Sequence, residues 1–137
     1  MEIRITSVVV RLPLAQPPVF DVQAELSNVS TEWMDLTRAD YCLVFRGVPV
    51  RCDRFPEKDS RIRVLGNRTM QVSLSVQPSP RETAAVLTAV LNGSGPPVSV
   101  LKGTAHVETA VGGIEFDFVT EPIQVRLKDV TVELDGF

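Results

Sequence analysis

Hydrophobic and polar residues alternate in several stretches of the chain, as they do in strands that bury one face. In residues 20–28 (FDVQAELSN) every second side chain from Phe20 to Leu26 is apolar, and the side chains between them are polar. Residues 70–76 (MQVSLSV) alternate in the same way. Residues 3–12 predict a first strand and residues 62–65 a short one. The pattern therefore predicts a mainly β protein.

Residues 36–46 and 48–53 predict a hairpin whose loop is Arg46-Gly47. A two-residue loop fixes the register, and here it places the apolar side chains of both strands on one face. The expected pairs are Phe45 with Val48, Leu43 with Val50, and Tyr41 with Cys52.

The chain has two cysteines, Cys42 and Cys52, one on each strand of this hairpin. In the expected register Cys42 pairs with Arg51 and points to the opposite face from Cys52. A disulfide between them would need a three-residue turn or a bulge. We therefore favour two free thiols.

Two glycines, Gly112-Gly113, separate a strand at 98–109 from an alternating run at 114–118, and they predict a second hairpin. A last strand is expected at 123–134. Its apolar residues change parity near Lys128-Asp129, where a one-residue bulge would keep both halves facing inward.

One helix is predicted, at about residues 79–92. Ser79 suits the N-cap, Pro80 the first helical position and Glu82 a capping box. Asn92-Gly93 ends the pattern. The apolar stripe along one side consists of Val86, Leu87, Val90 and Leu91.

Seven or eight antiparallel strands with one short helix predict a β-sandwich. The chain has 137 residues, of which 44% are hydrophobic, and this is enough for one domain with its own core. Since neither a linker nor a repeat is evident, we expect a single domain over residues 1–137.

Charge and hydropathy narrow the class of partner. The formal net charge is −3 and a basic run is absent, so nucleic acid is not an expected partner. No stretch approaches the roughly 20 apolar residues that cross a bilayer. The opening segment, MEIRITSVVVRLPL, lacks the pattern of a signal peptide. The expected location is cytoplasmic as the sequence is written, or exported to the envelope if an upstream signal has been removed.

Candidate catalytic residues are few. His106 is the single histidine, and its neighbours in strand phase, Thr104 and Glu108, are polar. A general base or a metal ligand needs partners that the sequence does not place beside it, so a solvated strand histidine is favoured. The sequence thus predicts no catalytic, cofactor-binding or metal-binding residues, and we do not expect an enzyme.

A charged loop is expected at residues 54–61. Asp53, Glu57 and Asp59 offer carboxylates for calcium, but their spacing is not that of an EF-hand. Basic residues interleaved with them would repel a cation, and these are Arg51, Arg54, Lys58, Arg61 and Arg63. A solvated loop is favoured. Gly112-Gly113 is expected as a turn and not as a phosphate cradle, because no helix follows it.

Trp33 and Met34 follow the strand at 20–28, either as an exposed contact for a partner or as a plug at one end of the sandwich. The plug is favoured, because a lone tryptophan in a small domain usually buries most of its surface. Three N-x-[ST] triplets would accept glycans in a secreted protein, and the sequence leaves their use open. They begin at Asn28, Asn67 and Asn92.

The order of these signals resembles the type 2 late-embryogenesis-abundant proteins, the LEA14-like group with the WHy (water stress and hypersensitive response) domain. The segments that carry the resemblance are a strand into an Asn-containing corner, then YCLVFRGVPV, TMQVSLSV, PRETAAVLTAVL, VLKGTAHVE and a final hairpin. The likeness covers about residues 6–134. One departure lies at the corner, where the family usually has Asn-Pro-Asn and this chain has Asn28-Val29-Ser30. An asparagine there can still hydrogen-bond nearby backbone.

The resemblance implies a fibronectin-III-like or Ig-like sandwich and a non-enzymatic, chaperone-like role in the stress response, in tolerance of desiccation or freezing. The partners expected are protein clients, whose inactivation or aggregation the protein limits. The alternative is a partner-binding Ig-like module of a surface or envelope assembly. A third interpretation, lipid association, needs an apolar groove.

Overall fold

The computed structural model describes residues 1–12, 16–92 and 96–128, which form nine strands and one helix. The strands are β1 (Glu2–Arg11), β2 (Val19–Ser27), β3 (Met34–Phe45), β4 (Val48–Phe55), β5 (Ile62–Val64), β6 (Thr69–Val76), β7 (Val98–Thr109), β8 (Gly112–Val119) and β9 (Ile123–Lys128), and the helix is α1 (Thr83–Asn92). The predicted class, mainly β with one short helix, is confirmed, and the described chain has nine strands where seven or eight were expected. The bulge expected near Lys128-Asp129 lies at and beyond the end of the described residues.

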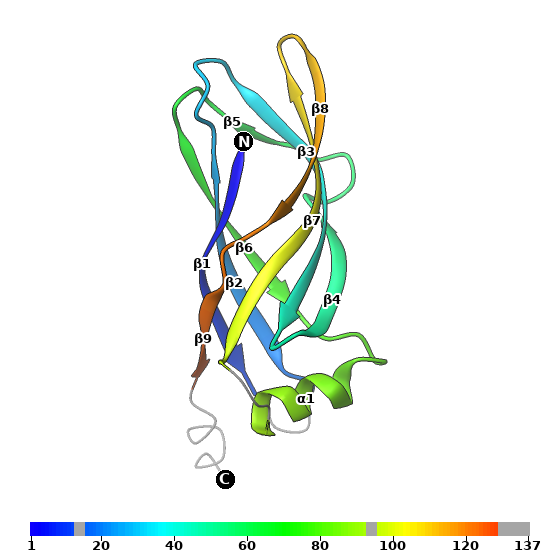
Figure 1. The fold of residues 1–137 in the computed structure, drawn as a ribbon. Helices are drawn as coiled ribbons and strands as arrows, with labels where there is room; N and C mark the ends of the chain where they lie inside the picture. Colours follow the sequence, from blue (N-terminus) through cyan, green and yellow to red (C-terminus); the bar gives the residue numbers. More distant parts are fainter. Residues whose placement is uncertain (13–15, 93–95, 129–137) are drawn as a thin grey trace.

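The strands form two sheets that face each other (Figure 1). One sheet has the order β9-β1-β2-β6, and the other has the order β4-β3-β7, with β5 beside β3 and β8 beside β7. β9 joins the two sheets, because its first residues pair with β7 and its later residues pair with β1. The result is a sandwich that is nearly closed into a barrel. β4 and β6 end the order of paired strands, so no ladder of the described residues joins them, and the region between them is bounded at one end by a hydrogen bond from Ser79 N to Val50 O of β4, at 3.2 Å.

One pair of strands departs from the antiparallel sandwich that the sequence predicted. β9 runs parallel to β1, with the register from Val8 opposite Val125 to Arg11 opposite Lys128. The other pairs in the described chain are antiparallel. An alternating pattern identifies a buried face but carries no information on the direction of a distant neighbour, so the pattern could not predict this pairing.

The apolar face of β2 lies at the centre of the core, as the alternation in residues 20–28 predicted. Phe20, Val22, Ala24 and Leu26 are all buried. The core continues as two clusters. One lies towards α1 and includes Val86 and Val90 of the helix, and the other gathers around Leu36, Val64 and Val107.

The helix lies across one end of the sandwich, where it is shown at the bottom of Figure 1. It begins at Thr83, four residues later than predicted, and residues 80–82 form a turn before it. Ser79 still acts at this end, because its Oγ accepts a hydrogen bond from Glu82 N at 3.3 Å and its carbonyl accepts from Thr83 N at 3.0 Å. In place of predicted Leu91, which is 64% exposed, Ala89 completes the buried stripe.

The β3–β4 hairpin has the predicted loop, Arg46-Gly47, and both loop residues have positive φ angles of 50° and 77°. Phe45 pairs with Val48 as predicted. The pairs predicted beyond that point are wrong, because Val50 is an extra residue that forms a bulge. The observed partners are Leu43 with Arg51, Cys42 with Cys52, and Tyr41 with Asp53.

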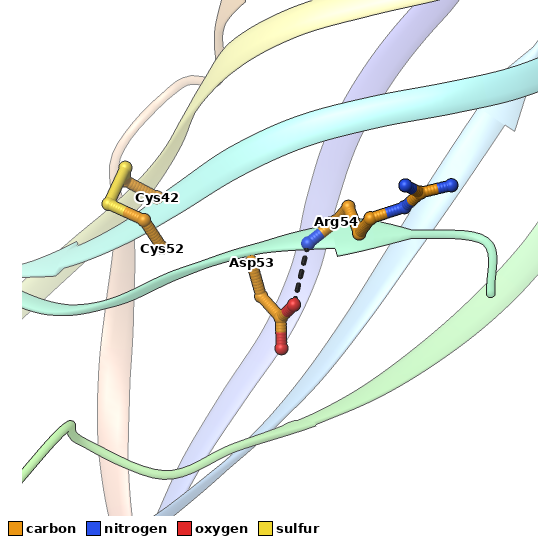
Figure 2. The surroundings of a disulfide bond; sticks show 4 residues. All are labelled: Cys42, Cys52, Asp53 and Arg54. Atoms are coloured by element: carbon orange, nitrogen blue, oxygen red, sulfur yellow. Dashed lines mark hydrogen bonds between the residues drawn. A yellow bond between two sulfur atoms is a disulfide. The ribbon is translucent and has the colours of Figure 1, made fainter. Parts of the chain in front are cut away.

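The bulge brings the two cysteines together, and Cys42 forms a disulfide with Cys52 across the strands (Figure 2). Their Cα atoms are 4.0 Å apart. The prediction of two free thiols is therefore wrong. The physical reason for the bulge is Phe55. Its side chain packs on the core although Phe55 lies an odd number of positions from buried Val50. One extra residue between them lets both side chains face inward.

The β7–β8 hairpin turns at Ala110-Val111, two residues before the predicted Gly112-Gly113. The two glycines instead begin β8, where Gly112 adopts a φ of 134° that suits glycine. This register places large side chains opposite small ones. Phe116 lies opposite Ala105, and Phe118 lies opposite Gly103.

Candidate functional site

The residues first considered for chemistry are not gathered into a site. In the described part of the chain, no three His, Cys, Asp or Glu side chains form a group that could hold a metal ion. His106 lies on the outer face, where its Nδ1 is 3.4 Å from Glu115 Oε2. Asp53, Glu57 and Asp59 are exposed.

The corner after β2 is held by Asn28, whose side chain is almost wholly buried, with 2% of the residue exposed. Its Nδ2 donates to the carbonyl oxygens of Glu32 at 2.7 Å and Val64 at 3.0 Å. Its Oδ1 accepts from Ser30 N at 3.0 Å and from Ser30 Oγ at 2.9 Å. Both ends of the amide are thus used, and the corner forms without the proline that the family usually has there.

The same contacts exclude one of the three candidate glycan acceptors in this fold. A glycan would be attached at Asn28 Nδ2, which is buried and donates both of its hydrogens to backbone, so Asn28 is not an acceptor in this fold. Asn67 is exposed in a turn with a φ of 57°, and Asn92 is exposed at the end of α1.

A buried carboxylate near this corner was not identified from the sequence. The side chain of Asp35, at the start of β3, has 0% exposure. Arg63 of β5 binds it with two hydrogen bonds, from Nε to Oδ1 at 2.8 Å and from Nη2 to Oδ2 at 3.1 Å. Arg61 Nη1 donates to Asp35 Oδ2 at 3.2 Å and to Glu108 Oε2 at 3.0 Å. We call Asp35, Arg61, Arg63 and Glu108 the arginine cluster.

The arginine cluster ties β5 to β3 and β7 electrostatically. The hydrogen bonds from Arg63 are the largest influence on the Asp35 carboxyl, and with those from Arg61 they lower its pKa despite the opposing effect of burial. The Arg63 guanidinium lies over the ring of Trp33, 4.3 Å from the ring centroid. Trp33 is thus half-buried beneath an arginine, while Met34 packs against the core cluster at this end.

The disulfide lies on the surface of the second sheet. It borders a shallow hollow of about 390 Å³, whose lining residues are Asp40, Tyr41, Cys42, Cys52, Asp53 and Arg54. In Figure 2 Asp53 Oδ1 accepts a hydrogen bond from Arg54 N, at 2.8 Å. The lining carries two carboxylates and one arginine, and Cys52 is exposed to solvent.

The outer face of β1, β2 and β6 is covered by polar side chains that bind one another, and we call it the polar face. Glu25 accepts from Arg4 Nη2 and from Gln71 Nε2, each at 2.8 Å, and these bonds lower its pKa, that from Gln71 most. Gln23 Oε1 accepts from Ser73 Oγ at 2.8 Å. Two further pairs on this face are Ser27 with Thr69 and Arg11 with Asp21.

The open region between β4 and β6, which we call the seam, contains two spaces of different character. The outer space is polar, with a volume of about 260 Å³, and Arg51 and Asp53 of β4 face Ser75 and Gln77 of the β6 side across it. Tyr41 also borders it, and burial, with the charge of Asp53, raises the pKa of this tyrosine.

The inner space of the seam is an apolar crevice of about 30 Å³ that extends between the sheets, where core residues such as Leu36 and Leu101 also line it. Its walls include Phe55, Val72, Leu74 and Phe118, each of them half-buried. This crevice has room for about one methyl or water-sized group.

No helix in the described residues is long and apolar enough to cross a membrane.

Comparison with known proteins finds solved structures of similar fold but no match in sequence. No family model matches the chain, and no curated protein matches it. Among solved structures, AT1g01470 from Arabidopsis thaliana matches 93% of this chain and 84% of its own, with 12% identity and a TM-score of 0.66. A protein from Archaeoglobus fulgidus matches 93% of this chain and 98% of its own, with 12% identity and a TM-score of 0.54.

A proposed late embryogenesis abundant protein, At2g46140.1, is also among the matching structures, with 12% identity, 91% of this chain, 71% of its own and a TM-score of 0.49. Identities this low show a shared fold and do not transfer a function. These matches confirm the predicted fold, and the likeness to the LEA14-like group drawn from the sequence stays a resemblance.

Proposed function

We propose that this protein protects other proteins from inactivation during drying or freezing, without catalysis. The observation that carries the proposal is the polar face. Its carboxylates, arginines, amides and hydroxyls are bound to one another, so the face is polar and nearly balanced in charge. Such a surface stays hydrated and offers little apolar area for association with partly unfolded proteins.

The folded core supports this function, because a protective surface must itself survive the loss of water. The buried corner of Asn28 and the arginine cluster each hold residues distant in sequence together, and the Cys42–Cys52 disulfide links the two strands of one hairpin. A molecule of this kind can stand between unfolding clients as a spacer and limit their contact.

The test is to dry or freeze-thaw a labile enzyme alone, with this protein, or with an equal mass of an inert globular protein. Recovered activity should exceed that with the inert control, and nucleotide should not be needed. His106→Ala should protect as the parent does, because His106 has no assigned role. Leu74→Asp should not give the protection that the folded parent gives, because an unpaired carboxylate in the core unfolds the sandwich.

A variant of the polar face makes the test specific. Gln23→Val with Ser73→Val removes one hydrogen-bonded pair and places two apolar β-branched residues on the outer surface. We expect this variant to stay folded, since valine favours strands, and to protect less well. Protection by the parent protein that merely equals that of the inert control would refute the proposal, and a partner-specific binding module would then take its place.

A further inference from the structure

We propose that the free edge of β6, at the seam, binds an extended segment of a partly unfolded polypeptide by adding it as a strand to the sheet. This inference rests on the proposed function and gives that function a binding site.

The first support is the pairing of β6. It pairs with β2 along its whole length, from Thr69 opposite Ser27 to Val76 opposite Phe20. No other strand of the described chain pairs with it. Every second backbone N–H and C=O of β6 therefore faces the seam, and another extended backbone is the partner that satisfies such a row.

The second support is that β6 lacks the features that protect the edges of other strands. Residues Thr69–Val76 include neither a charged residue nor a proline, and their register with β2 is unbroken. β4 has the Val50 bulge, Pro49 and several charged residues. The β8 edge carries Glu115 and Asp117. Charges, prolines and bulges prevent strand addition, so β6 is the edge of these three that remains competent for it.

The third support is the chemistry beside the edge. Val72 and Leu74 of β6 point inward and line the apolar crevice with Phe55 and Phe118. A strand paired with β6 would place alternate side chains above this crevice, whose volume of about 30 Å³ suits a small apolar group. Its other side chains would face the polar outer space beside Arg51 and Asp53. The seam thus fits a segment that alternates small apolar residues with polar ones.

The geometry favours a single extended segment over a second folded copy. β4 borders the same space as β6, since Arg51 and Asp53 line it together with Ser75 and Gln77. A strand needs a separation of about 4.8 Å from β6 to pair with it. A second copy pairing through its own β6 would also bring its own β4 hairpin into this space, where it would meet the β4 hairpin already there.

The probe is a short fluorescent peptide that alternates threonine and valine, with lysine at each end for solubility. Its control has the same side chains but is N-methylated at every residue between the lysines, so that neither edge can donate hydrogen bonds. We expect the first peptide to bind, measured by fluorescence anisotropy, and the second not to bind. Amide hydrogen exchange of the folded protein should slow on binding within Thr69–Val76 and stay unchanged in β8.

A pair of matched variants tests the location. Ser75→Lys places a charge on exposed Ser75 at the β6 edge, and it should weaken peptide binding roughly tenfold. Ile114→Lys places the same charge on the β8 edge and should leave binding unchanged. Equal binding of both peptides would overturn the inference. So would amide exchange that slows on binding in β4 or β8. Amide exchange in β6 that slows without peptide, in step with dimerisation of the protein, would also overturn the inference and assign the edge to a second copy.

The outcome is separable from that of the proposed function. If the parent protects dried enzyme and Ser75→Lys protects equally well despite lost peptide binding, the client site is refuted and the protective function stands. If the peptide binds β6 but the parent protects no better than the inert control, the site stands and the protective function is refuted.

Discussion

Replacing Asn28 by aspartate exchanges one NH₂ group for an oxygen, and we expect this small change to destabilise the fold severely at neutral pH. The NH₂ group donates to the carbonyl oxygens of Glu32 and Val64, at 2.7 and 3.0 Å. A carboxylate would instead place a negative oxygen against these two acceptors, inside a site where Asn28 is 2% exposed. Asn28→Ala is the control without a charge, because it removes the same donors, and it also removes the Oδ1 that accepts from Ser30.

The magnitudes follow from the bonds that are lost. A buried acceptor left without its donor costs about 1–3 kcal/mol. In Asn28→Ala two carbonyls lose a donor, and Ser30 N and Ser30 Oγ lose an acceptor. Only the bond to Val64 is wholly buried, and the other three are partly buried. We therefore expect Asn28→Ala to lower the free energy of unfolding by about 3 kcal/mol. Asn28→Asp keeps the acceptor for Ser30, but the desolvated and repelled charge should still make it about 2 kcal/mol less stable than Asn28→Ala.

Urea denaturation measures both effects. With an m-value of about 2 kcal/mol/M, Asn28→Ala should lower the midpoint by about 1.5 M, and Asn28→Asp should lower it further. Burial raises the pKa of the introduced carboxyl above its unfolded value of about 3.9. The additional cost of Asn28→Asp is therefore present at neutral pH and shrinks as the pH falls towards about 4. Equal midpoints for the two variants at neutral pH, or a difference that does not change with pH, would refute the reasoning.

Three further predictions concern other contacts. The unfolded, unreduced protein should not react with a thiol reagent, and reducing the Cys42–Cys52 disulfide, whose sequence separation is 10, should cost about 3 kcal/mol; reactive thiols before reduction would contradict this. The lowered pKa of Asp35 contributes stability above the unfolded value of about 3.9 that is lost as the pH falls through the folded pKa. Asp35→Asn should therefore flatten the acid limb of a stability–pH profile. An unchanged acid limb would show that Asp35 is not the source of the stability lost at low pH. Ser79→Ala should cost about 1 kcal/mol, because Ser79 Oγ accepts from Glu82 N, and an unchanged urea midpoint would remove the N-cap assignment.

The strands were predictable from the sequence because burial on one face leaves a local alternation. The faces of β2 and β6 follow directly from the order of apolar and polar residues in 20–28 and 70–76. The Val50 bulge had a signal as well, since Phe55 has the opposite parity to Val48 and Val50. Treating that change of parity as a bulge would have aligned Cys42 with Cys52 and predicted the disulfide.

The arginine cluster and the seam were less accessible, because both depend on which distant strands are neighbours. Asp35 looks like an ordinary polar residue at the start of a strand, and its burial is a result of Arg63 on β5 and Arg61 just before β5 lying against it. The paired arginines two residues apart in RIR are a signal for one shared partner, but the sequence does not say which carboxylate it is. The seam exists because β4 and β6 end the order of strands, and local patterns do not specify that order.

The parallel pairing of β1 with β9 has a mechanical consequence. The two strands run in the same direction, so a force that pulls the N-terminal end of β1 away from the C-terminal end of β9 slides one strand along the other. The hydrogen bonds between Val8–Arg11 and Val125–Lys128 lie across that direction and are loaded together, whereas bonds in a hairpin pulled from its open end break one after another. Forced unfolding is governed by the unfolding rate. Stretched between its ends, this chain should therefore hold until the whole β1–β9 ladder shears at once.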